Sequence, residues 1–232
     1  MGELLIKDRD IVVPGQDLAT GMDFLPASGT FRDNDKIISG QLGSVSLNGR
    51  LIKIIPLNGR YVPKRGDVVI GIVKDMNFSN WFVDIGYAND AVLSSKEINV
   101  DYMERGADLS QFYDLGDYIA AKIYNVSKQK LIDLTMRGPG LRKLTDGRII
   151  KISSVKVPRV IGKEGSMISM IKDLTQCKIM VGQNGLVWIN GPDGNKELVA
   201  VEAINMVSDK TQVSNLTEKV KEFLEKRMKE NV

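Results

Sequence analysis

Short runs in which apolar and polar residues alternate fill the first third of the chain, and this pattern is typical of β-strands. Such runs occupy residues 11–13, 44–47, 51–55 and 61–62. The tetrapeptide Leu-Asn-Gly-Arg occurs twice, at residues 47–50 and 57–60. Asn-Gly between alternating runs favours a tight hairpin, because both turn residues tolerate positive φ. The pattern predicts a small all-β N-terminal domain over residues 1–64, in which the repeat makes hairpin turns.

The middle of the chain carries further strand-like runs, joined by turns rich in Gly, Asn and Asp. They occupy residues 68–74, 81–85, 91–94, 118–126 and 131–136. One longer connection, over residues 96–116, separates the third run from the fourth. Five short strands with this spacing favour a five-stranded Greek-key barrel of the OB type, predicted over residues 65–137.

Barrels of the OB type bind single strands of nucleic acid through aromatic side chains on one face, and each stacked base contributes about 1–3 kcal/mol. One aromatic residue of a neighbouring pair normally fills the core of a small barrel. We therefore expect Phe82 in the core, and Trp81 with Phe78 on the outer face. The net charge of this segment is −3, which argues against strong binding. The candidate RNA-binding residues of the barrel are Phe78, Trp81, Phe82, Lys128, Lys130 and Arg137.

Helical periodicity appears only in the last third, which predicts an α+β domain over residues 138–232. Apolar residues at 167, 168, 170, 171 and 174 predict a helix that begins at Ser166. A strand-like segment precedes it at residues 148–156, two strands follow at 178–181 and 186–189, and helices are predicted over 195–207 and 214–228. We expect the last, C-terminal helix to pack on the body or on a partner.

The formal net charge is only +3, so attraction to nucleic acid depends on where the charges lie. Residues 138–178 hold nine basic and three acidic side chains, a local charge of +6. If the chain meets a phosphate backbone, we expect the contact here. A solvated charged face is the alternative interpretation.

A GxxG pattern begins at Gly162, at Gly182 and at Gly191, and only its context separates the three. The second lies between predicted strands and ends in Asn-Gly, which predicts a hairpin turn. The third contains Pro-Asp-Gly and predicts a turn from strand to helix. The first has basic neighbours and a helix start, where glycines let a nucleotide chain approach bare backbone. This is the pattern of a KH loop, which clamps about four nucleotides of single-stranded RNA or DNA. The candidate clamp residues are Lys156, Arg159, Gly162, Lys163, Glu164 and Gly165.

Glu164 partly offsets the charge of Lys163, so we expect modest affinity. An inert, tight entry into the helix remains the alternative.

Histidine is absent and there is one cysteine, which excludes His-based triads, Cys/His zinc sites and disulfides. Enzymes that rely on carboxylates, Lys or Ser remain possible, although we find no Walker motif and no GxSxG. Acidic residues between 101 and 117 are spread along an irregular connection, so we expect no metal site and no cofactor. No apolar run approaches the roughly 20 residues of a membrane span, so we expect a cytoplasmic protein. Cys177 and Trp188 are expected to pack in the core.

The order of the three predicted domains and three sequence motifs together resemble a known family. Residues 11–18 read Ile-Val-Val-Pro-Gly-Gln-Asp-Leu, residues 82–86 read Phe-Val-Asp-Ile-Gly, and residues 159–168 read Arg-Val-Ile-Gly-Lys-Glu-Gly-Ser-Met-Ile. An N-terminal β domain, an S-one-type OB barrel and a KH domain in this order resemble the RNA-binding cap subunit of the archaeal exosome, over nearly the whole chain. The barrel family often carries a His where this chain has Leu93 and an aromatic residue where it has Ser79. Whether the barrel stacks bases or only lines a pore stays open.

The resemblance implies a non-catalytic subunit. It would form a three-fold cap with other cap subunits on a hexameric RNase PH-like ring and recruit single-stranded RNA for 3′-to-5′ degradation. The N-terminal domain would dock on the ring. A free-standing RNA-binding regulator of translation or transcription is the alternative. Polynucleotide phosphorylases also end in KH and S-one domains, but in the opposite order, and this chain has no catalytic segment.

Overall fold

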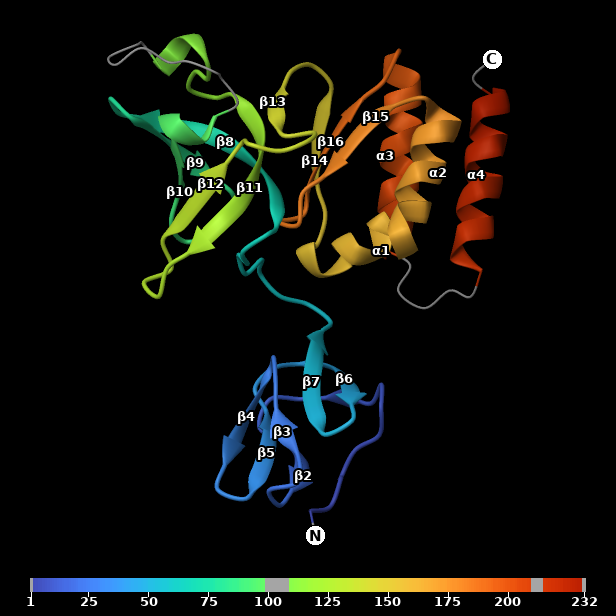
Figure 1. Cartoon of the computed structure of the whole chain (residues 1–232). Coiled ribbons are helices and arrows are strands. Elements are labelled where there is room, and N and C mark those ends of the chain that lie inside the picture. The colour runs from blue at the N-terminus through green and yellow to red at the C-terminus, as the bar shows by residue number, and fades with distance from the viewer. Residues whose placement is uncertain (1, 99–108, 210–214, 231–232) are drawn as a thin grey trace. The chain divides into compact units, whose positions relative to one another are not determined.

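The computed structural model describes residues 2–98, 109–209 and 215–230 (Figure 1). The chain divides into two compact units, Met1–Gly59 and Arg60–Val232. The second unit holds both the barrel and the α+β part. The domain boundaries predicted after residues 64 and 137 stay predictions.

Two small sheets form the first unit. The four-stranded sheet has the order β1 (Ile11–Val12), β6 (Gly43–Asn48), β7 (Leu51–Pro56), β3 (Leu25–Pro26), and the three-stranded sheet has the order β2 (Asp17–Thr20), β5 (Lys36–Ser39), β4 (Thr30–Asp33). Their inner faces share a core that contains Leu18, Ile37 and Ile52. Strands β2 to β5 were not predicted.

The two Leu-Asn-Gly-Arg repeats have different structures. The first is the predicted hairpin turn: Asn48 pairs with Leu51 across β6 and β7, and Gly49 has a φ of 59°. The prediction is wrong for the second repeat, at residues 57–60, and for the strand at residues 61–62. In the described part of the chain no strand follows this repeat to pair with β7. The division between the two units falls inside the second repeat.

The predicted five-stranded barrel is confirmed. Its strands are β8 (Val68–Met76), β9 (Asn80–Asp84), β10 (Ala91–Ser94), β11 (Tyr118–Val126) and β12 (Ile132–Thr135). They follow the order β12-β10-β9-β8-β11, and pairing of β11 with β12 closes the barrel. A short strand, β13 (Arg142–Leu144), extends the sheet beside β11. The 3-10 helices Ser95–Glu97 and Leu109–Gln111 precede and follow the undescribed part of the long connection.

The predicted positions of two barrel aromatics are wrong. Trp81 is fully buried, and its indole Nε1 donates a hydrogen bond to the Tyr113 carbonyl oxygen (2.9 Å). Phe82 is half-buried on the outer face. Because side chains alternate along β9, Trp81 shares the inward face with the buried Val83. Trp81 also makes an edge contact with Tyr113, with ring centroids 5.2 Å apart. The larger aromatic residue therefore fills the core, and Phe82 faces out.

The α+β part has a three-stranded sheet in the order β14 (Arg148–Lys151), β16 (Leu186–Asn190), β15 (Lys178–Val181). The helices α1 (Val157–Ile161), α2 (Ser166–Thr175), α3 (Gly194–Asp209) and α4 (Leu216–Glu230) lie on one side of it (Figure 1). Their shared core includes Cys177, as predicted. The strand predicted over residues 148–156 is too long, because β14 ends at Lys151 and a 3-10 turn (Ser154–Lys156) leads into α1. Pro158 lies in the first turn of α1, where a missing N–H is tolerated.

The other side of this sheet is covered by the barrel (Figure 1). Trp188 of β16 packs with Ile70 of β8, Ala120 of β11 and Leu144 of β13 in a separate buried cluster. The Trp188 indole N–H donates to the Asp146 carbonyl oxygen (2.8 Å), and the Arg142 guanidinium lies over its ring, 5.4 Å from the centroid. Trp188 is thus a packing residue, as predicted, and the barrel and the α+β part share one interface.

Candidate nucleic-acid interface

The first GxxG loop, residues 162–165, forms the tight turn between α1 and α2. Gly162 has a φ of 78°, and its N–H donates to the Pro158 carbonyl oxygen (2.9 Å). A Cβ at this position would lie 2.7 Å from the backbone nitrogen of Met167, so only glycine fits. Packing against α2 therefore requires the first glycine.

The second half of the loop is open. Glu164 and Gly165 both have positive φ, 53° and 81°. Apart from its chain neighbours, no heavy atom of the described residues lies within 4 Å of a Cβ built on Gly165. Gly165 is also the N-cap of α2 and provides no side-chain cap, while the N–H groups of Gly165 and Ser166 donate within the loop to the Gly162 and Lys163 carbonyl oxygens. Bare main chain at the amino end of a helix is a favourable place for a phosphate.

The predicted clamp cations differ in their surroundings. The Lys163 side chain is exposed beside Glu164, and Arg159 of α1 is half-buried. Lys156 instead lies before α1, and its ammonium donates to the Ser208 carbonyl oxygen of α3 (2.7 Å). The fold thus places Lys163 and the two glycines on one turn that directly follows the helix of Arg159, whereas Lys156 is bonded to another helix.

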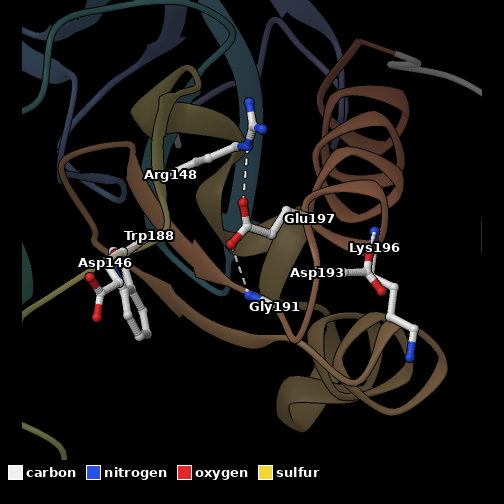
Figure 2. A network of polar contacts seen from close by, with 7 residues as sticks. All are labelled: Asp146, Arg148, Trp188, Gly191, Asp193, Lys196 and Glu197. Atoms are coloured by element: carbon white, nitrogen blue, oxygen red, sulfur yellow. Dashed lines mark hydrogen bonds and ion pairs between the residues drawn. The ribbon is translucent and has the colours of Figure 1, made fainter.

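The other two GxxG segments are turns with structural partners, as predicted. Residues 182–185 connect β15 to β16, where the Gly185 N–H donates to the Gly182 carbonyl oxygen (2.9 Å). Residues 191–194 connect β16 to α3. In this turn the Gly191 N–H donates to Glu197, whose other carboxylate oxygen accepts from Arg148 Nε, both at 3.0 Å (Figure 2).

Phe78 is fully exposed at the tip of the turn between β8 and β9. The Asn77 side-chain oxygen accepts hydrogen bonds from the Ser79 and Asn80 N–H groups (3.0 and 2.8 Å). The Asn77 N–H donates to the Asn80 carbonyl oxygen (2.9 Å). Hydrogen bonds between Asn77 and the two residues after Phe78 therefore define the turn that presents Phe78 to solvent.

Arg137 lies at the same end of the barrel as Phe78. Ser79, next to Phe78, accepts a hydrogen bond at its carbonyl oxygen from the Ser95 N–H (2.8 Å). Lys96 follows Ser95, and its carbonyl oxygen accepts from the Arg137 guanidinium. Lys96 is exposed and was not predicted. The signal for it was a lysine two residues after the third predicted strand of the barrel. Phe78, Lys96 and Arg137 thus gather at one barrel end.

The two remaining lysines lie at the opposite end. Lys128 and Lys130 belong to the turn between β11 and β12. Because β11 runs antiparallel to β8, with Lys122 opposite Val68, this turn lies beyond the start of β8, and Phe78 lies beyond its end. The predicted RNA-binding residues of the barrel therefore do not share one face.

Neither a metal site nor a membrane span is found in the described residues. No group of three or more Asp, Glu or Cys side chains among them could hold a metal ion. Asp101, Glu104 and Asp108 lie outside the described residues. The helices in this part of the chain are all too short or too polar to cross a membrane.

Known proteins match this chain over most of its length. Residues 60–125 match the family model described as "RRP4, S1 domain", and residues 147–195 match the KH domain model. The exosome complex component Rrp4 of Methanothermus fervidus is 42% identical over 222 residues, which cover 95% of this chain and 97% of that protein. The chain belongs to the Rrp4 family of exosome components. This membership confirms the resemblance predicted from the motifs.

Further similarities in sequence and structure support membership of the Rrp4 family. Rrp4 of Thermococcus kodakarensis is 42% identical over 235 residues, which cover 99% of this chain and 90% of that protein. A solved structure of an exosome complex RNA-binding protein is 36% identical, with a TM-score of 0.68 over 75% of this chain and 100% of that one. The S1 match of this Rrp4-family chain covers the first four barrel strands, and the KH match covers the α+β part up to the start of α3.

Proposed function

We propose that this protein is a non-catalytic, RNA-binding subunit of the exosome, acting in the cytoplasm. It caps a hexameric RNase PH-like ring together with further cap subunits, three to a ring, and recruits single-stranded RNA for 3′-to-5′ degradation. One observation carries the RNA-binding role: the open main chain at Gly165, next to exposed Lys163 and the uncapped amino end of α2. A bend filled by its own side chains could not accept a nucleotide chain.

Two surfaces of the second unit are proposed to contact RNA. The clamp of Arg159, Gly162, Lys163, Glu164 and Gly165 holds the sugar-phosphate backbone. At the barrel end described above, Phe78 stacks on a base while Lys96 and Arg137 contact phosphates. Of the other predicted barrel residues, Lys128 and Lys130 would meet a different stretch of RNA, half-buried Phe82 offers an outer-face contact, and buried Trp81 has none.

The clamp is tested by reversing one charge. We expect Lys163→Glu to weaken binding of a single-stranded RNA, measured by fluorescence anisotropy, because it places two carboxylates beside the phosphate path. The thermal unfolding midpoint should not change, since the side chain is exposed. Lys219→Glu is the matched control: it makes the same charge change on the exposed surface of α4. Equal affinities for wild type and Lys163→Glu would contradict the clamp.

Docking on the ring is proposed for the first unit, whose four-stranded sheet carries exposed aliphatic side chains on its outer face, around Lys53 of β7. Ile11, Ser44 and Ile55 are opposite one another across β1, β6 and β7, so their side chains point to the same side. Leu51 shares this side with Ile55 and is paired with Leu25 of β3. These four large aliphatic residues are exposed. Exposed apolar patches of this kind are typical of protein interfaces.

A pull-down separates the two candidate functions. We expect ring subunits to co-purify with the wild-type protein from its native extract and to be lost with Ile55→Asp. Phe31→Asp, on an equally exposed apolar residue of the other sheet, is the control that should keep them. Absence of ring subunits from the wild-type sample would favour the free-standing regulator. The purified chain should neither hydrolyse nor phosphorolyse RNA, and activity that survives removal of all partners would contradict a non-catalytic role.

A further inference from the structure

Lys156 joins the segment before the clamp to the end of another helix. It is the last residue of the 3-10 turn that leads into α1, six positions before Gly162. Its ammonium donates to the carbonyl oxygen of Ser208, 2.7 Å away, and its side chain is half-buried. Ser208 lies in the last turn of α3 and is itself buried.

The chemistry of this contact is that of a helix C-cap. The last four carbonyl groups of a helix have no partner within the helix, and a cation near them is favourable. A hydrogen bond from an ammonium group is stronger than one between neutral groups. If Lys156 moved out to a phosphate, it would leave the Ser208 carbonyl without this bond. The local structure therefore favours the bond to α3.

Packing carries the effect of this bond to the clamp. Val157 and Val160 of α1 are fully buried in the same core as Val207 of α3. The helix α1 has only five residues and ends at Gly162, whose N–H donates to Pro158 of that helix. Fixing the start of so short a helix also fixes where the clamp begins. We propose that Lys156 is a positioning residue of the RNA clamp and not one of its phosphate ligands; this rests on the proposed RNA-binding function.

The salt dependence of RNA binding tests the assignment. Each phosphate neutralised on a single strand contributes about 0.7 to the slope of log K against log salt. We expect Lys156→Met to weaken binding of a single-stranded RNA by about two- to tenfold with the slope unchanged, and Lys156→Arg to restore affinity. The matched variant Lys163→Met should make the slope shallower by about 0.7. A slope as shallow in Lys156→Met as in Lys163→Met would overturn the proposal.

A second measurement needs no RNA. Amide hydrogen exchange over residues 157–165 should be faster in Lys156→Met than in the wild type, because the N-cap residue of α1 loses its bond to α3. The same amides in Lys163→Met should exchange as in the wild type. Unchanged exchange in Lys156→Met would overturn the positioning role. If the wild-type protein failed to bind RNA at any salt concentration, the proposed function would be wrong, and the exchange result would still decide what Lys156 does.

Discussion

Asn184 pairs with the backbone of Ile70 as a neighbouring strand would. Its side-chain Nδ2 donates to the Ile70 carbonyl oxygen (2.7 Å), and its Oδ1 accepts from the Ile70 N–H (3.3 Å). The same Nδ2 also donates to the Ile85 carbonyl oxygen (2.9 Å). Asn184 is buried, at the tip of the hairpin between β15 and β16. One amide group of the KH domain thus satisfies three backbone groups of the barrel.

Replacing this amide should destabilise the protein. Asn184→Ala leaves buried backbone groups of Ile70 and Ile85 without partners, and we expect the free energy of unfolding to fall by roughly 2–4 kcal/mol. Urea denaturation followed by fluorescence measures the change. Gln183→Ala is the control, because Gln183 contacts the barrel through its backbone N–H, which donates to the Val68 carbonyl oxygen. A loss as large in Gln183→Ala would show that the side-chain bonds of Asn184 do not matter.

The two barrel aromatics at the centre of the sequence prediction should have separate effects. Phe78→Ala should weaken RNA binding by about 1–3 kcal/mol and leave stability unchanged, because Phe78 is fully exposed. Trp81→Phe should do the reverse, since it leaves a cavity in the core and removes the bond to the Tyr113 carbonyl. Anisotropy titrations and thermal unfolding of both variants check this. If folded Trp81→Phe lost RNA affinity while Phe78→Ala kept it, Phe78 would not be the stacking residue.

The two clamp glycines should also respond differently. Gly162→Ala meets both a positive φ and the backbone of Met167, so we expect a large loss of stability, with about 1–3 kcal/mol from the backbone conformation alone. Gly165→Ala has open space and should cost about 1–2 kcal/mol. It should nevertheless weaken RNA binding, because the added methyl group covers bare main chain. Calorimetry and RNA titrations measure both effects.

Gly116→Ala is the control for this pair, since Gly116 has a similar φ of 89° and open space but lies in the barrel. It should lose about as much stability as Gly165→Ala and keep wild-type RNA affinity. Equal RNA affinities in Gly165→Ala and Gly116→Ala would argue that no nucleotide lies against the clamp.

Alkaline pH should weaken the protein through Tyr61. Burial and the hydrogen bond from its hydroxyl to Asp67 (2.7 Å) raise the pKa of Tyr61 well above its usual value near 10. The stabilisation is therefore complete below pH 10 and is lost as pH rises, by at most about 1.4 kcal/mol per pH unit. Tyr61→Phe removes this dependence, so its stability deficit against the wild type should shrink between pH 8 and pH 11. A constant deficit would contradict the assignment.

The barrel and the helices were predictable because their patterns are long and regular. All five barrel strands and the helix at Ser166 follow from periodicity and turn residues, and so does the hairpin at Asn48. Strands β1 to β5 have two to four residues each, too few for a period to show, and β2 to β5 were missed. The short helix α1 was missed because its Val, Pro and Ile residues do not favour helices on their own.

The site was predictable only where chemistry is local. A GxxG with a lysine and a helix start can be recognised in sequence, and the structure gives the loop the expected open face. Which of Trp81 and Phe82 points inward depends on strand register, and the signal for it was the alternation of neighbouring residues: Trp81 shares a face with Val83, whereas Phe82 shares one with the polar Asp84. Asn184 was missed for a different reason: Asn-Gly in a turn predicts exposure, and only the packing of the barrel against the hairpin buries it.

The sheet of the KH domain lies between its own helices and the barrel, with Trp188 in the second layer of contacts. This arrangement predicts that a fragment truncated before residue 138 will aggregate. Without the barrel, its Trp188, Ile149 and Leu186 side chains would be exposed to water as an apolar patch. The barrel and the KH domain share this interface, so neither can be replaced by the corresponding domain of another protein unless the interface residues of both are changed together.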